Sequence, residues 1–228
     1  KVPLTPDFQL DLPAMEEAVD DFTKMIFICS PNNPTGNSIE RGAIEALLNN
    51  YFGIVVLDEA YINFSRQRSF VPDLVDYPNL VVLQTLSKAW GLAALRVGMA
   101  FASKEIIHIM NKIKPPYNIN QASQELVLKA LDEVEQVNEM IRVLVQERGR
   151  LEQAFNAMDL VEKVYPSDAN FLLVKVKEAK KIYKYLLDKG IVVRDRSSVI
   201  LCDNCLRITV GTERENNELL TAFEKYNP

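Results

Sequence analysis

The 228-residue sequence has few of the residues that build disulfide and zinc frameworks, with three cysteines and one histidine. An odd number of cysteines excludes a complete disulfide framework and favours a reducing compartment, so we expect a cytoplasmic location. Cys202 and Cys205 have the spacing of a metal-binding pair, but the sequence offers no second pair and no nearby histidine. Because a structural zinc site needs four ligands, we expect no bound metal.

Positive charge is also scarce. The chain has 26 Lys and Arg residues against 31 Asp and Glu residues, which gives a formal net charge of -5. Nucleic-acid-binding domains usually carry a basic excess, so we expect no nucleic acid partner. The sequence also lacks a run of about 18 apolar residues, which a membrane-spanning helix needs, so we expect no membrane partner. Small molecules or other proteins are the favoured partners.

What is present is the composition of an ordinary globular protein, with 48% hydrophobic and 25% charged residues. The length suffices for a sizeable core and for one or two domains. The sequence begins at Lys1, within an extended segment punctuated by prolines. We therefore expect it to be a portion of a longer protein.

Strands and helices alternate along the amino-terminal part of the chain. Apolar runs predict strands, and the first three end in polar loops. The expected strands span residues 25–29, 52–57, 80–83 and 98–102. This alternation is typical of a mainly parallel α/β sheet. The last strand follows too closely for a helical crossover, so we expect it to run in the reverse direction.

Residues 120–158 have a helical pattern too long for one ordinary helix, and we expect an interruption near Asp132. The sequence then predicts strands over 171–176, 191–194 and 206–210, a helix over 178–189 and a final helix. The final helix opens with a capping box, in which Thr212 and Glu215 satisfy each other's backbone donors. These elements predict a smaller α+β domain over residues 132–228, after an α/β domain over residues 1–131.

Polar residues follow the strand over 80–83. Thr85, Ser87 and Lys88 come directly after it, and Arg96 stands further along the chain. Open α/β sheets bind their ligands at the carboxyl ends of strands, and hydroxyls, an amine and a guanidinium suit an anionic group. A lysine that reacts as a free amine needs a neighbouring cation, such as Arg96, or desolvation. The alternative is an ordinary surface lysine.

Two earlier strands end in polar residues as well, namely Asn33 after the first and Asp58 and Tyr61 after the second. Each has an ordinary alternative, because Asn33 suits a turn, Asp58 a helix cap and Tyr61 simple packing. An aldehyde cofactor with a phosphate and a basic ring nitrogen needs an amine, an anion site, a carboxylate and donors for a phenolate oxygen. The sequence supplies each of these: the amine is Lys88, the anion site is Ser87 with Arg96, and the carboxylate is Asp58. The donors for the phenolate oxygen are Asn33 and Tyr61.

Three motifs in this order resemble those of the pyridoxal-phosphate aminotransferases of the aspartate aminotransferase fold. They are Ser30-Pro31-Asn32-Asn33-Pro34-Thr35-Gly36, Asp58-Glu59-Ala60-Tyr61, and Ser87-Lys88 followed by Arg96. More narrowly, the chain resembles the histidinol-phosphate aminotransferases of that family over essentially its whole length. The resemblance implies that residues 1–131 are the carboxyl-side part of the major, cofactor-binding domain. Residues 132–228 would then be the small carboxyl-terminal domain.

The resemblance also assigns the cofactor-binding residues for pyridoxal 5'-phosphate. Lys88 would be the Schiff-base lysine and the carrier of the transferred proton, and Asp58 would keep the ring nitrogen protonated. Tyr61 and Asn33 would bind the phenolic oxygen. The residues implied for the cofactor phosphate are Thr85, Ser87 and Arg96. In this family the Asn33-Pro34 bond is often cis.

Two arginines of the second domain resemble the anion-binding arginines of the family. Arg207 stands in the middle of an apolar strand, where an unpaired charge is costly, and a bound anion accounts for it. Arg194 is the second, although the sequence alone leaves Arg196 open, and its alternative role is a surface ion pair with Asp195. Guanidinium groups give a planar, bidentate grip on phosphate or carboxylate. Asn170 resembles a further substrate-binding position, with a loop-ending polar residue as the alternative.

The implied activity is transfer of an amino group between L-histidinol phosphate and 2-oxoglutarate, in histidine biosynthesis, by a homodimer. Other aminotransferases and phospho-amino-acid decarboxylases of the same fold carry similar motifs and remain alternatives. A nucleoside triphosphatase is disfavoured, because the strand ending in Asp58 lacks a companion phosphate-binding loop. The family's chains are longer at the amino end, where further cofactor-binding elements lie. We therefore also expect that this chain alone binds the cofactor weakly and is an inactive portion of the enzyme.

Overall fold

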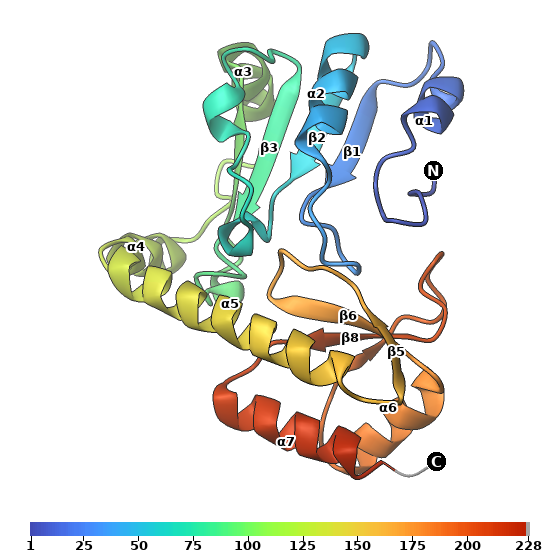
Figure 1. Cartoon of the computed structure of the whole chain (residues 1–228). Coiled ribbons are helices and arrows are strands. Elements are labelled where there is room, and N and C mark those ends of the chain that lie inside the picture. Colours follow the sequence, from blue (N-terminus) through green and yellow to red (C-terminus); the bar gives the residue numbers. More distant parts are fainter. Residues whose placement is uncertain (227–228) are drawn as a thin grey trace. The chain divides into compact units, whose positions relative to one another are not determined.

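The computed structural model describes residues 1–226 and divides the chain into two compact units (Figure 1). The first unit comprises Lys1–Pro31 and Ser38–Glu139, and the second comprises Asn32–Asn37 and the chain from Met140 onward. The domain boundary expected after residue 131 stays a prediction. In the structure the last change of unit falls between Glu139 and Met140, within a helix. The hexapeptide Asn32–Asn37 is separated in sequence from the rest of its unit.

The first unit contains a four-stranded sheet in the order β1 (Met25–Cys29), β2 (Ile54–Asp58), β3 (Leu80–Thr85) and β4 (Gly98–Ala102). The first three strands are parallel, and β4 is antiparallel to β3, which confirms the predicted reversal. Asp58 pairs with Cys29 of β1 on one side and with Leu83 of β3 on the other. The three parallel strands therefore end at one edge of the sheet.

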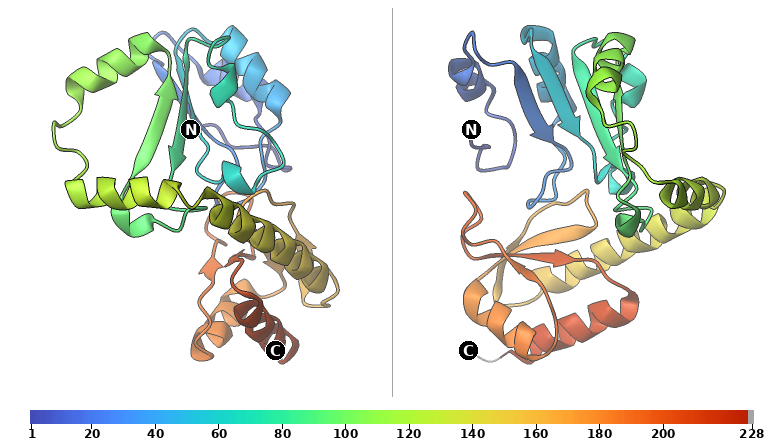
Figure 2. Two further views of the ribbon diagram at one scale, coloured as in Figure 1. Left: turned by 90° about the vertical axis from the view of Figure 1, so that its left-hand side faces the viewer. Right: turned by 180° about the vertical axis from the view of Figure 1, so that it is seen from behind.

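Among the described residues, the first unit also contains four helices before α5 (Val134–Asn156). The helices are α1 (Leu12–Ala18), α2 (Arg41–Asn50), α3 (Lys104–Ile113) and α4 (Gln121–Leu131), with short 3-10 turns at Ile62–Phe64, Val71–Asp73 and Ala93–Leu95. Figure 2 shows α2 and α3 on opposite sides of the sheet. The α2 side carries the apolar core, because alternate strand residues such as Val55, Leu57 and Leu80 pack against Ile44 and Leu48.

The predicted interruption near Asp132 is confirmed, since α4 ends at Leu131 and α5 (Val134–Asn156) begins two residues after Asp132. The 23 residues of α5 include many charged side chains on its exposed face. Within residues 1–226, no helix combines the length and the apolar content that crossing a bilayer requires.

The second unit contains an antiparallel sheet in the order β5-β6-β8-β7. Its strands are β5 (Val161–Val164), β6 (Phe171–Val176), β7 (Arg194–Asp195) and β8 (Cys205–Thr209), and its further helices are α6 (Ala179–Asp188) and α7 (Glu213–Glu224). The strand predicted over 191–194 is wrong for its first three residues, because pairing with β8 begins only at Arg194. The sequence prediction also missed β5, whose short run alternates with exposed Glu162 and Lys163.

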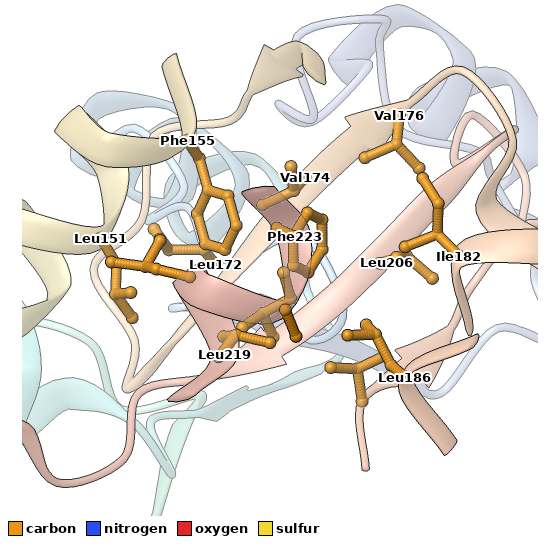
Figure 3. Packing of buried hydrophobic residues seen from close by; sticks show 14 of the residues in the cluster. Leu151, Phe155, Leu172, Val174, Val176, Ile182, Leu186, Leu206, Leu219 and Phe223 are labelled. Carbon is orange, nitrogen blue, oxygen red and sulfur yellow. The ribbon is translucent and has the colours of Figure 1, made fainter. Parts of the chain in front are cut away.

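The core of the second unit lies on one face of this sheet. Leu172 and Val174 of β6 and Leu206 of β8 point toward Phe155 and Phe223, whose rings meet edge to face with centroids 5.0 Å apart (Figure 3). Side chains alternate along a strand, so the neighbours of Leu206 occupy the opposite face. That opposite face carries Cys205, Arg207 and Thr209 of β8.

The three thiols differ in environment. Cys202 and Cys205 are 0% exposed, whereas Cys29 is half-buried, and none is in a disulfide. Burial raises the pKa of the Cys202 thiol, and burial together with the neighbouring Cys202 raises the pKa of Cys205 to about 12. Reactive thiolate is therefore scarce at both positions at neutral pH.

This difference predicts selective alkylation. In the native protein at neutral pH, iodoacetamide should label Cys29 well before Cys202 or Cys205, and all three should react in denaturant. Peptide mass spectrometry over a time course measures the labelling. Cys29→Ser is the control, which should remove the fast phase, and rapid native labelling of Cys205 would contradict the described burial.

Candidate active site

The carboxyl end of β2 positions Asp58 and Tyr61. Asp58 is the last residue of β2, and its Oδ1 accepts a hydrogen bond of 2.9 Å from the Ala60 N–H. This local turn ends the strand and leads into the 3-10 turn Ile62–Phe64, which Tyr61 precedes. The Tyr61 ring is buried, at 6% exposure, so its position is fixed by packing.

The segment after β3 presents Lys88 beside that ring. Thr85 Oγ1 accepts a hydrogen bond of 3.0 Å from the Ser87 N–H, and Leu86 N donates to Val97 O over 3.2 Å. These bonds turn the chain at the strand end. Lys88 is exposed, and its Nζ lies 5.3 Å from the centroid of the Tyr61 ring. The structure thus brings together two residues that the sequence predicted for one site.

Arg96 has an uncommon backbone conformation. Its φ of 57° and ψ of 38° place it in the left-handed region, which a residue other than glycine seldom adopts. Its Nη1 donates to Ala93 O over 3.0 Å, and its side chain is exposed. Because Thr85 pairs with Gly98, the start of β4 runs beside the end of β3. The turn containing Arg96 therefore adjoins the segment that carries Ser87 and Lys88.

Glu59 organises this edge of the sheet, and the sequence analysis missed its role. It is 1% exposed and accepts hydrogen bonds from Ser69 Oγ at 2.5 Å, Phe70 N at 2.8 Å and Gln84 Nε2 at 2.9 Å. A buried carboxylate needs such donors to offset its lost hydration. Glu59 therefore fixes the end of β2 to β3. The sequence did contain a signal for this role, because Glu59 is a second acidic residue directly after the end of β2.

The hexapeptide Asn32–Asn37 is held by hydrogen bonds inside the second unit. Gly36 O accepts from Asp168 N at 2.7 Å and from Ser167 Oγ at 3.4 Å. A Cβ atom on Gly36 would lie 2.6 Å from Ser167 Oγ, and its φ of +86° suits glycine. The bond between Asn33 and Pro34 is cis, as the resemblance implied, and so is the bond between Ser30 and Pro31. The loop thus has a fixed, locally crowded backbone.

This loop brings Asn33 to Arg207. Arg207 Nη1 donates to Asn33 Oδ1 over 2.8 Å, and its guanidinium carbon lies 5.0 Å from the centroid of the Phe171 ring. A cation over an aromatic face is favourable, so both contacts orient the guanidinium. Two residues that the sequence assigned to different groups, Asn33 for the cofactor and Arg207 for the substrate, are therefore direct partners.

Arg194 lies on β7 beside Arg207, and Asn170 directly precedes β6. Arg194 pairs directly with Arg207 across β7 and β8, so both side chains start from the same face of the sheet. Arg194 has no ion pair within residues 1–226, and the alternative partner Asp195 accepts instead from the N–H and Oγ of Ser197. Asn170 accepts a hydrogen bond from Val210 N through its backbone oxygen at 2.9 Å.

The predicted site residues therefore form one group on each unit. The group on the first unit is Asp58, Tyr61, Thr85, Ser87, Lys88 and Arg96, and the group on the second is Asn33, Asn170, Arg194 and Arg207. The exposed His108, the only histidine, stands on α3 and belongs to neither group. The first group offers an amine, a carboxylate, hydroxyls and a guanidinium. The second offers guanidinium groups for an anion.

Comparison with known proteins identifies a matching family. The model of the family "Aminotransferase class I and II" matches residues 1–223. Among curated proteins, the histidinol-phosphate aminotransferase of Cytophaga hutchinsonii is 52% identical over 225 residues, covering 99% of this chain and 65% of the relative. That of Parabacteroides distasonis is 54% identical over 224 residues, covering 98% of this chain and 65% of the relative. The chain thus spans just under two thirds of the length of these relatives.

Solved structures have the same fold. The histidinol-phosphate aminotransferase of Clostridium acetobutylicum matches with a TM-score of 0.89 and 25% identity, covering 97% of this chain and 69% of that one. The L-threonine-O-3-phosphate decarboxylase of Porphyromonas gingivalis matches with a TM-score of 0.80 and 28% identity, covering 92% and 66% respectively. The predicted fold class, a mainly parallel sheet with a smaller α+β part, is confirmed.

The crowding at Gly36 predicts a stability loss. Gly36→Ala should lower the free energy of unfolding by roughly 1–3 kcal/mol, because the new Cβ is strained at this φ and collides with Ser167. Chemical denaturation followed by circular dichroism measures the change. Gly149→Ala in α5 is the matched control, since nothing lies within 4 Å of its Cβ position and a helical Gly→Ala change stabilises by about 0.5–1 kcal/mol. Equal midpoints for the two variants would contradict the crowding.

Proposed function

The chain belongs to the class I and II aminotransferase family, and we propose that it is part of an enzyme that transfers an amino group between L-histidinol phosphate and 2-oxoglutarate. The relatives of about 50% identity support this reaction. The observation that carries the proposal is the 5.3 Å approach of Lys88 Nζ to the Tyr61 ring, at the sheet edge where Asp58 ends β2. An amine, a phenol and a carboxylate thus follow or end neighbouring parallel strands.

The first-unit group fits pyridoxal 5'-phosphate by the chemistry of its donors. When bound, this cofactor supplies an aldehyde that reacts with amines and a protonated ring that accepts electron density from the substrate. Asp58 would hold the ring nitrogen in its protonated form. Thr85, Ser87 and Arg96 would bind the phosphate, because two hydroxyls and a guanidinium together supply several donors to its oxygens.

Lys88 would act as acid and base. Its exposed amine has a flexible four-carbon stem, so it can take a proton from the substrate Cα and return it at a neighbouring position. The Tyr61 hydroxyl and the Asn33 amide would donate hydrogen bonds to the phenolic oxygen. Both are held in place locally, Tyr61 by burial and Asn33 by its contact with Arg207.

The second-unit group would bind the anionic ends of the substrates. Arg194 and Arg207 suit either the phosphate of L-histidinol phosphate or a carboxylate of 2-oxoglutarate, because a guanidinium grips both in a bidentate way. Asn170 would contribute a polar contact beside Phe171. We further propose that the complete enzyme is a homodimer in the cytoplasm, and the three thiols outside disulfides support a reducing compartment.

A decarboxylase is the second candidate. It is favoured by the 28% identity and TM-score of 0.80 with the L-threonine-O-3-phosphate decarboxylase of Porphyromonas gingivalis. An assay of products separates the two, since a transaminase yields glutamate and a keto-phosphate whereas a decarboxylase releases carbon dioxide. The lower identity to this structure than to the curated aminotransferases makes transamination the stronger proposal.

The role of Lys88 can be tested by spectroscopy. Titration of pyridoxal 5'-phosphate into the chain should produce an absorbance band from bound cofactor, and borohydride reduction should fix the label on Lys88, as located by peptide mass spectrometry. Lys88→Ala should lose both signals, because Lys88 is the residue whose amine lies beside the Tyr61 ring. Lys104→Ala, on the exposed start of α3, is the control and should keep them. A wild-type spectrum in Lys88→Ala would refute the assignment.

Asp58 should matter more than the Tyr61 hydroxyl. Asp58→Asn removes a charge that acts on the reacting ring, so we expect a loss on the order of a hundredfold in the rate of the amino-transfer half-reaction. Tyr61→Phe removes one neutral hydrogen bond, which corresponds to a loss of under about tenfold. Stopped-flow absorbance of the cofactor band measures both rates in the complete enzyme, because this chain alone is expected to be inactive. Losses of similar size would contradict this ranking.

A further inference from the structure

A third arginine lies beside the pair Arg194 and Arg207. Arg196 N donates to Cys205 O over 2.8 Å, which continues the pairing of β7 and β8 beyond Asp195. Arg196 is therefore opposite Cys205. Since alternate residues of a strand share a face, Arg196 starts from the same face as Arg194 and Arg207. This is the face opposite the apolar core.

The side chain of Arg196 has an unsatisfied donor. Its Nε is buried and has no hydrogen-bond partner within residues 1–226. Arg196 also makes no ion pair in the described part of the chain, and its charge only partly offsets burial, which raises the pKa of Cys202. A buried charged donor without an acceptor is unfavourable, and an anion oxygen is the acceptor that best relieves it.

The loop that follows Arg196 fixes its backbone. Successive turns join Val199 N to Arg196 O, Cys202 N to Val199 O, and Cys205 N to Cys202 O, each at 2.9–3.0 Å. Cys202 of this loop and Cys205 at the start of β8 are fully buried. A guanidinium on so constrained a backbone loses less freedom when it binds a ligand.

Three like charges on one sheet face repel one another unless an anion lies between them. We propose that Arg196 completes an anion site with Arg194 and Arg207 and gives it a preference for a phosphate monoester over a carboxylate. The inference rests on the proposed function, since the phosphate in question is that of the substrate. It assigns the specificity for phosphate to a residue outside the Arg194 and Arg207 pair.

The preference follows from the number of acceptor oxygens. A carboxylate has two oxygens, which a single bidentate guanidinium can occupy. A phosphate monoester has three terminal oxygens and a larger charge, so it accommodates donors from more than one guanidinium. A third arginine therefore adds more to phosphate binding than to carboxylate binding.

The experiment is a titration of the full chain with inorganic phosphate, followed by ³¹P NMR. Arg196→Gln should weaken phosphate binding by about tenfold, as expected for the loss of a charged hydrogen-bond donor. Arg196→Lys keeps the charge and should fall between wild type and Arg196→Gln, which preserves the test if the neutral variant folds poorly. Arg214→Gln is the matched control, because Arg214 is an exposed arginine paired with Glu218 on α7, and it should bind phosphate as wild type does.

The possible outcomes separate this inference from the proposed function. Unchanged binding by Arg196→Gln, with weakened binding by Arg194→Gln and Arg207→Gln, would overturn the inference and leave the proposed function intact. Unchanged binding by all three variants, or no phosphate binding by wild type, would overturn the proposed anion site together with the inference. Competition with glutarate tests the preference, and an equal loss of affinity for glutarate in Arg196→Gln would reject it.

Discussion

The in-register parallel pairing of β1, β2 and β3 is the constraint on which the group of predicted site residues in the first unit depends. Asp58 pairs with Cys29 on one side and Leu83 on the other, so three strands stop at one edge. The loops that follow these strands therefore begin close together, and backbone pairing alone brings their polar residues near one another. Glu59 strengthens this arrangement, because its buried carboxylate binds both the loop at Phe70 and Gln84 of β3. The backbone pairing sets the positions, and the Glu59 network holds them.

In the second unit, the alternation of side chains along a strand positions the predicted site residues. Leu206 and Ile208 enter the core, and the residue between them, Arg207, is thereby forced to the opposite face. The apolar packing thus orients a charged group without needing a further interaction. Pairing with β7 adds Arg194 to that face, and the loop residue Asn33 accepts a hydrogen bond from Arg207.

Patterns that depend on local sequence were predictable. The strands of the first unit, the reversed β4 and the interruption before α5 follow from periodicity and connection length. Positions that depend on distant partners were not. The strand β5 was missed because it is short and two of its four residues, Glu162 and Lys163, are charged and exposed. The contact between Asn33 and Arg207 was missed because it joins residues 174 positions apart. The buried role of Glu59 depends on donors from Ser69 and Gln84, which no motif encodes.

The placement of Asn32–Asn37 has a consequence for folding. This hexapeptide reaches its hydrogen-bond partners at Ser167 and Asp168 only after more than a hundred further residues have been made, since Gly36 and Ser167 are 131 positions apart. Such a non-local contact closes a long loop and so raises the contact order of the chain. During synthesis, the strands β1 to β4 can pair before the hydrogen-bond partners of the hexapeptide have been synthesised. The second unit is therefore completed late, and it cannot be excised as one continuous stretch of sequence without losing the segment that carries Asn33.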